Sequence, residues 1–172
     1  MFRCIIRSCR SIQANLAFIP ADHVADFTEF CRQNPGPLPV LHKSYESGDF
    51  NAEPLSNDFS DARTDAAGYE VYVDGVRQEP QKYLLPPSKY EDMHVFYLGC
   101  SFGFENALAK AKVPLRNVDQ RKNVSMYRTN VKMNPASESL YQCKYVLTVL
   151  YLIRSAFSVV IWSSQCVTYR VT

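Results

Sequence analysis

Residues 94–111 read HVFYLGCSFGFENALAKA, and this stretch decides the fold class of the chain. Its first six residues form an apolar run of strand length, and the next four, CSFG, are predicted to turn. Phe104, Leu108 and Ala111 then recur at helical spacing, and Pro114 ends the helix because proline lacks an amide proton. The order strand, tight turn, helix predicts a mixed α/β (α+β) fold.

The residues before this stretch predict a strand followed by a helix. Residues 15–19 predict a short strand that ends at Pro20. The next apolar residues recur at helical spacing, and Asp22 stands where it would cap the first turn. Residues 34–37 read NPGP and end that helix. The helical stripe consists of Val24, Phe27, Phe30 and Cys31, and we interpret it as core packing.

The middle of the chain predicts a surface excursion and then a hairpin. Residues 42–68 are polar and rich in turn formers, which favours a long surface loop. Residues 69–73 alternate as a strand does, and Asp74-Gly75 is a strong signal for a two-residue hairpin turn. Val76 then begins the return strand.

Charge and cysteine content exclude several classes of protein. The formal net charge of the 172 residues is only +2, and no block combines basic density with interleaved aromatics, which argues against a nucleic-acid partner. The six cysteines form no CxxC pair and no zinc-finger spacing with histidine, so we expect reduced thiols. The three histidines are far apart in the sequence, and neither a metal site nor a Ser-His-Asp triad is predicted.

The turn after residue 99 is the first candidate for chemistry. A turn between a buried strand and a helix aims unpaired backbone N–H groups at one point, which attracts anions. Cys100 and Ser101 lie at its mouth, and Glu105 follows one helical turn later as a possible general acid or base. The alternative is that Cys100 is a small buried apolar residue and Ser101 a plain helix cap.

Residues 123–130, NVSMYRTN, are the second candidate. They bring together a guanidinium, a phenol, hydroxyls and amides, which suits bidentate binding of a carboxylate. The alternative is a polar strand edge whose arginine pairs with one of the many acids. The substrate-binding candidates in this segment are Arg128, Tyr127, Thr129 and Asn130.

Several motifs, in the same order, resemble the D-glutamate cyclase and hydro-lyase family. The resemblance covers about residues 13–134, the N-terminal half of such a domain. The most specific matches are residues 99–105, GCSFGFE, and the segment at 123–130. Weaker matches are QANL at 13–16, Phe27 with Phe30-Cys31, Asn34-Pro35, Pro39, RTD at 63–65, Tyr69 to Val73 and Asp74-Gly75.

This resemblance implies a lyase without a cofactor, acting on a small carboxylate such as D-glutamate. The family reaction converts D-glutamate to 5-oxo-D-proline and water. For this reaction we predict that Glu105 acts as acid or base, that the turn at Cys100 and Ser101 forms an anion cradle, and that Arg128, assisted by Tyr127, clamps the other carboxylate. Animal members resemble enzymes of the mitochondrial matrix, which agrees with residues 1–12, a basic and acid-free stretch typical of a short presequence.

Residues 135–172 form a divergent apolar tail in which we see no family motif. One explanation is a translated intron, alternative exon or gene-model error. A second is a membrane helix near residues 145–162, although Arg154 lies close to its centre. A third is a pair of strands, because Val, Tyr, Ile and Thr dominate. Under the first explanation the domain is truncated, and we expect weak or no activity; a non-catalytic anion-binding module and a membrane-anchored protein are the alternatives.

Overall fold

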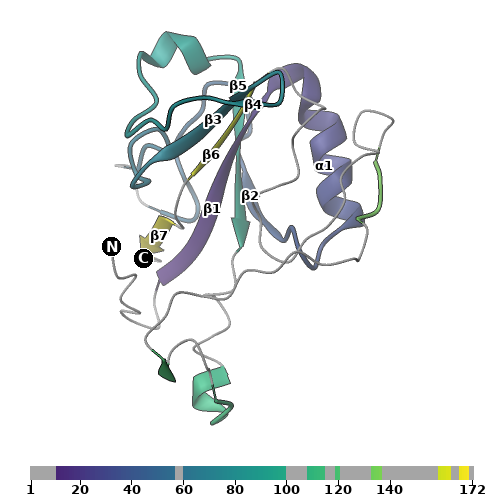
Figure 1. The fold of residues 1–172 in the computed structure, drawn as a ribbon, viewed down its shortest axis with the longest axis vertical. Helices are drawn as coiled ribbons and strands as arrows, with labels where there is room; N and C mark the ends of the chain where they lie inside the picture. Colours follow the sequence, from purple (N-terminus) through teal and green to yellow (C-terminus); the bar gives the residue numbers. More distant parts are fainter. Residues whose placement is uncertain are drawn as a thin grey trace.

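A seven-stranded antiparallel sheet dominates the structure (Figure 1). The structure is a computed structural model that describes residues 11–56, 60–99, 108–114, 119–120, 133–136, 159–163 and 167–170. The strands are β1 (Ser11–Pro20), β2 (Val40–Lys43), β3 (Tyr69–Val73), β4 (Val76–Arg77), β5 (Met93–Gly99), β6 (Val159–Ser163) and β7 (Val167–Arg170). Their order is β2-β5-β1-β6-β3-β4, and β7 also pairs with β1. Together with the helix α1 (Val24–Gln33), this sheet confirms the predicted mixed α/β class.

Strand β1 lies at the centre of the sheet. It pairs with β5 from Ala14 opposite Gly99 to Pro20 opposite Met93. On its other side it pairs with β6 and, nearer its start, with β7. Because side chains alternate along a strand, Leu16 and Phe18 face one core cluster while Ala17 and Ile19 face the other. Both faces of this strand are therefore buried, and the short strand predicted at residues 15–19 is confirmed within β1.

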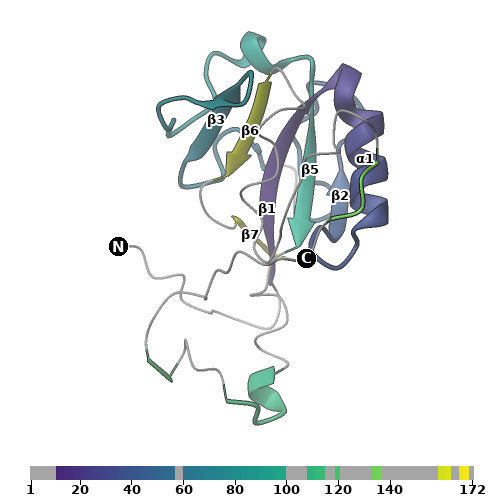
Figure 2. The same ribbon diagram turned by 45° about the vertical axis from the view of Figure 1, so that its right-hand side comes forward.

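Helix α1 covers one face of the sheet, beside β2 and β5 (Figure 2). Phe27 is 2% exposed and meets Phe96 of β5 edge to face, with ring centroids 4.8 Å apart. Phe30 and Cys31 are also buried on this side. Burial of each such side chain contributes about 1.5–3 kcal/mol, so the helical stripe is the core face that its spacing indicated.

The predicted helix start is wrong in one detail. Asp22 does not cap α1 but lies inside the short 3-10 helix η1 (Ala21–His23). The N-cap of α1 is His23, and it makes no side-chain cap hydrogen bond. The chain turns first through η1 because Pro20 at the end of β1 breaks the ladder and the backbone N–H of Ala21 bonds to Asp92.

The predicted surface excursion at residues 42–68 is also different in the structure. It begins within strand β2, which pairs with β5 across a register shift between Val40 and His42. Beyond β2, the segment covers the sheet face opposite α1 with buried Phe50, Ala52 and Ala62. The buried apolar residues of this segment are separated by turns and recur at no regular spacing. The sequence pattern therefore did not predict this layer.

The predicted hairpin is confirmed as β3 and β4. Tyr72 pairs with Arg77 and Val73 with Val76. The two turn residues have positive φ angles, 48° at Asp74 and 74° at Gly75. A two-residue turn with this geometry matches the right-handed twist of its strands, and aspartate followed by glycine adopts it most readily.

Two strands come from the apolar tail. Strand β6 inserts between β1 and β3, with Val71 opposite Ile161, and β7 extends the β1 ladder. These described residues of the tail agree with the third explanation, a pair of strands. No helix among the described residues is long and apolar enough to cross a membrane. The stretch at 141–158, which contains most of the membrane-helix alternative, lies outside them.

Candidate functional site

The seven candidate site residues lie outside the residues that the structure describes. Their proposed roles therefore stay predictions. They are Cys100, Ser101, Glu105, Tyr127, Arg128, Thr129 and Asn130. What the structure does describe is how the fold holds the chain at the near end of the first candidate segment, residues 100–105, and just beyond the second, residues 123–130.

The first candidate segment starts from a tightly held strand end. Gly99 is the last residue of β5, and its N–H donates to the carbonyl of Pro39 at 2.8 Å. A Cβ atom at this position would lie 3.2 Å from Cγ of Pro39 and 3.5 Å from Cδ2 of Leu41. The close approach explains a glycine at the position, and it fixes the end of β5 against Pro39.

The predicted helix after the turn is seen at its C-terminal end. Residues 108–110 are helical. Lys112 then adopts a left-handed φ of 56°, while its N–H bonds to Ala109 and that of Val113 bonds to Leu108. This closure ends the helix before Pro114, as predicted. In Figures 1 and 2 the helical turn lies away from the sheet, and residues 109–114 are exposed.

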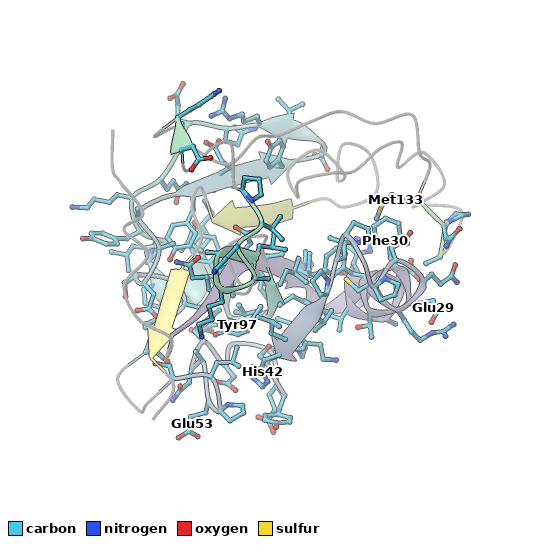
Figure 3. All side chains as sticks on the ribbon, turned by 90° about the horizontal axis from the view of Figure 1, so that it is seen from below. Glu29, Phe30, His42, Glu53, Tyr97 and Met133 are labelled. Atoms are coloured by element: carbon cyan, nitrogen blue, oxygen red, sulfur yellow. The ribbon has the colours of Figure 1, made fainter. Side chains whose placement is uncertain are left out.

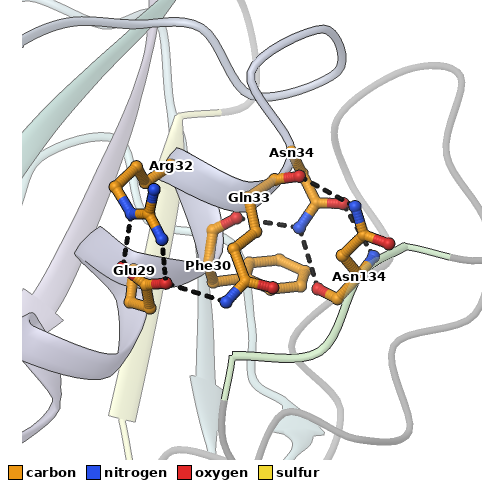
Figure 4. Close-up of polar contacts among 6 residues, drawn as sticks. All are labelled: Glu29, Phe30, Arg32, Gln33, Asn34 and Asn134. Carbon is orange, nitrogen blue, oxygen red and sulfur yellow. Dashed lines mark hydrogen bonds and ion pairs between the residues drawn. The ribbon is translucent and has the colours of Figure 1, made fainter.

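The chain just beyond the second candidate segment is clamped to the end of α1 (Figure 4). The side-chain amide nitrogen of Asn34 donates to the carbonyl of Phe30 at 2.8 Å and to that of Asn134 at 2.9 Å. Its amide oxygen accepts the N–H of Asn134 at 2.8 Å. Asn134 in turn donates through its own side chain to the carbonyl of Gln33 at 3.0 Å. Of the carbonyls at the helix end, that of Phe30 is thus satisfied by the side chain of Asn34 and that of Gln33 by the distant Asn134.

An apolar contact accompanies this clamp. Met133 is 9% exposed and belongs to the core cluster that contains Phe30 of α1. Figure 3 shows the two side chains on the same side of the helix. Ala136 packs against the same cluster. Residues 133–136 are therefore held by packing as well as by hydrogen bonds.

One short loop carries both attachments. Asn34 clamps Asn134, and Pro39, five residues later, accepts the N–H of Gly99. Five residues span at most about 17 Å when extended, and a hydrogen bond from Leu38 to the carbonyl of Asn34 shortens this loop further. The sequence predicted residues 34–37 only as a helix stop. No local signal could have shown that the buried Asn34 bonds across the chain.

Tyr97 of β5 and His42 of the neighbouring β2 are held by packing and hydrogen bonds within the fold. The hydroxyl of Tyr97 donates to the carbonyl of Asn51 at 3.2 Å, and burial raises the pKa of this phenol far above its usual range. The ring of His42 stands 5.5 Å from that of Tyr97 (Figure 3), and burial lowers the pKa of its imidazole although Asp49 acts in the opposite direction. A phenol held protonated in a main-chain hydrogen bond is unsuited to proton transfer at neutral pH.

Arg63, from one of the motifs that resemble the family, also has a structural role. Its guanidinium binds both carboxylate oxygens of Asp61, at 2.9 and 2.7 Å, and lies 4.4 Å from the ring centre of Phe50. Burial acts to raise the pKa of Asp61, but the hydrogen bonds from Arg63 outweigh it and the pKa is lowered. Among the described residues, no three His, Cys, Asp or Glu side chains are grouped to hold a metal ion.

Comparison with known proteins identifies the family of these segments. The sequence model of the family described as D-glutamate cyclase matches residues 95–167. That range includes both candidate segments. It also includes residues 135–167 of the apolar tail, for which the motifs indicated no family counterpart.

Bacterial relatives match a longer stretch of the chain. A protein of Verminephrobacter eiseniae named "Putative hydro-lyase" is 44% identical over 125 residues, 73% of this chain and 44% of its own length. Proteins of the same name from Paraburkholderia phymatum and Azorhizobium caulinodans are each 45% identical, over 119 and 126 residues. These cover 69% and 73% of this chain, and 45% of each relative. The chain thus spans less than half the length of the curated relatives it matches, and the resemblance found in the motifs is confirmed.

Proposed function

We propose a D-glutamate cyclase function for this chain, which by its matched residues belongs to the D-glutamate cyclase and hydro-lyase family of lyases. The observation that carries the proposal is the family match across residues 95–167, which contains both candidate segments. The loop at residues 34–39 supports it, because the chain next to each of these segments is attached there.

The proposed reaction is an intramolecular condensation. The amine of D-glutamate loses a proton and attacks the side-chain carboxyl carbon, and the departing hydroxide leaves as water, giving 5-oxo-D-proline. This needs a general acid or base, which we assign to Glu105, and donors for the developing oxyanion, which we assign to the turn at Cys100 and Ser101. Arg128, with Tyr127, binds the carboxylate that does not react. Thr129 and Asn130, in the same segment, are the further substrate-binding candidates.

We further propose that the 172-residue chain by itself turns over D-glutamate slowly. It spans less than half the length of its relatives. In the described part of the chain, residues 109–114, at and after the helical turn of residues 108–110, are exposed, and the exposed fraction of Val113 is 45%. An exposed element beside the candidate turn favours poor preorganisation of the site, and preorganisation supplies much of the rate in such reactions.

The direct test is to incubate the purified chain with D-glutamate and measure 5-oxo-D-proline by chiral chromatography with mass detection. L-glutamate serves as the substrate control and Glu105→Gln as the variant control. Formation of the D product that Glu105→Gln reduces at least about a hundredfold supports the proposal, in the range expected for loss of a general acid or base. Equal rates of product formation by the unaltered chain and by Glu105→Gln would show that Glu105 takes no part in the reaction.

A non-catalytic small-anion-binding module is the alternative from another class. It is favoured by the same two segments, whose polar side chains suit carboxylate binding without chemistry. Saturable binding of D-glutamate in calorimetry without any product selects this alternative. Absence of both binding and product refutes both assignments.

The location of the protein is also a proposal. We propose the mitochondrial matrix, because residues 1–12 carry three arginines and no acid. A fluorescent fusion that loses mitochondrial targeting when residues 1–12 are deleted supports this location. Resistance of the protein to carbonate extraction from membranes would instead favour anchoring through the tail.

A further inference from the structure

We infer that Asn34 is a positioning residue that holds Gly99 and Asn134, the described residues beside the two candidate segments, in one relative placement. It clamps Asn134, which follows the second segment, at the start of the loop whose other end binds Gly99, which precedes the first. The consequence for D-glutamate rests on the proposed function. The mechanical coupling itself does not, and it is tested separately.

The clamp needs the amide of an asparagine. Asn34 is 6% exposed, and its NH2 group donates to the carbonyls of Phe30 and Asn134 while its oxygen accepts from the N–H of Asn134. Aspartate has the same shape and keeps the acceptor, but an ionised carboxylate cannot donate to two carbonyls. It would also place negative charge at the C-terminal end of α1, where the helix dipole disfavours it.

The two asparagines contribute unequally. Truncation of Asn34 removes three hydrogen bonds, of which one joins it to the helix and two join it to Asn134. Truncation of Asn134 removes only its side-chain bond to the carbonyl of Gln33, because its other two contacts use its backbone. A clamp centred on Asn34 therefore predicts a large effect at one position and a small effect at the other.

Loosening at Asn34 reaches Gly99 through the loop. The carbonyl of Asn34 accepts the N–H of Leu38, and the next residue, Pro39, accepts the N–H of Gly99. Leu38 is 2% exposed, so its packing resists independent movement of the two ends. Both attachments therefore belong to one small rigid unit, and the binding proposed for D-glutamate depends on the geometry of that unit.

The test compares four chains: the unaltered protein, Asn34→Ala, Asn34→Asp and, as the matched control, Asn134→Ala. Hydrogen exchange by NMR follows the amides of Asn134 and Gly99, with the amide of Leu16 as a reference for the core. We expect exchange at both clamp amides to rise about tenfold or more in the two Asn34 variants and by less than about threefold in Asn134→Ala. Exchange at Leu16 should stay unchanged, which separates local loosening from global unfolding.

An unchanged Gly99 amide in Asn34→Ala, with Asn134 released, would overturn the inference. So would equal effects of Asn34→Ala and Asn134→Ala. Calorimetry with D-glutamate forms the second arm, in which Asn34→Asp should weaken binding about tenfold while Asn134→Ala leaves it within about twofold. Binding that is equal in all four chains overturns the positioning role. If the unaltered chain binds no D-glutamate, the proposed function fails. The exchange experiment then still decides whether Asn34 couples the chain at Asn134 to the chain at Gly99.

Discussion

Ser44 provides the sharpest prediction about stability, because one hydroxyl completes the ladder between β2 and β5. Its backbone N–H donates to the carbonyl of Val95 at 2.9 Å, and its Oγ accepts the N–H of Val95 at 3.0 Å. Both residues are 0% exposed. The same hydroxyl lies 3.3 Å from Nδ1 of His94. Strand β2 ends at Lys43, so this side chain serves where a backbone partner is missing.

Ser44→Ala should destabilise the protein by about 2 kcal/mol. The change leaves the buried N–H of Val95 without a partner, and such a group costs about 1–3 kcal/mol. Alanine leaves almost no cavity, so the packing loss is small. In a chain of this size a loss of about 2 kcal/mol lowers the melting temperature by about 4–8 °C.

Urea denaturation followed by circular dichroism measures this change, with Thr28→Ala as the matched control. The hydroxyl of Thr28 is exposed and donates to the carbonyl of Val24 within the helix, so its loss should change stability by less than about 0.5 kcal/mol. The amide of Val95 should also exchange faster in Ser44→Ala. Equal unfolding midpoints for the two variants would refute the assignment of the hydroxyl as the ladder partner.

Three further predictions follow from α1. Phe27→Ala should cost about 3–5 kcal/mol in urea denaturation, because it empties the site against Phe96; a loss below about 1 kcal/mol would contradict this packing. Hydrogen bonds from Arg32 lower the pKa of Glu29 from 4.5 to about 2, so the stability from this pair is complete above pH 4.5 and is lost as the pH falls toward 2. An NMR titration should give this pKa and show its return toward 4.5 in Arg32→Ala. Burial raises the pKa of the Cys31 thiol to about 12, so iodoacetamide at pH 8 should modify it only after unfolding, as peptide mass mapping will show.

Elements with a regular period could be predicted from the sequence. The alternation at residues 69–73, the Asp74-Gly75 turn and the stripe of α1 each depend on neighbours along the chain, and the structure confirms all three. The strands at 15–19 and 94–99 were also predicted, although β1 extends from residue 11 to residue 20. Their ends depend on which neighbours pair with them, and a local pattern does not contain that information.

Elements without a regular period could not be predicted. Residues 42–68 looked like a surface loop, but Phe50, Ala52 and Ala62 bury against the sheet because the other strands provide an apolar face for them. Asp22 satisfied the pattern of a helix cap, yet the tertiary path through η1 placed His23 there. In both cases a contact with distant residues outweighed a local preference.

The sequence by itself indicated the resemblance to the family, the mixed α/β class, the strand at residues 94–99 and the helix end before Pro114, because motif identity and hydrophobic period are properties of neighbouring residues. Only the tertiary structure decided that Asn34 and Pro39 secure the chain beside the two candidate segments, and that residues 159–163 enter the sheet between β1 and β3. The physical reason is that a hydrogen bond between residues 34 and 134, or a ladder between distant strands, leaves no periodic trace in the chain. Its free energy arises only when folding brings the partners together and excludes water from them.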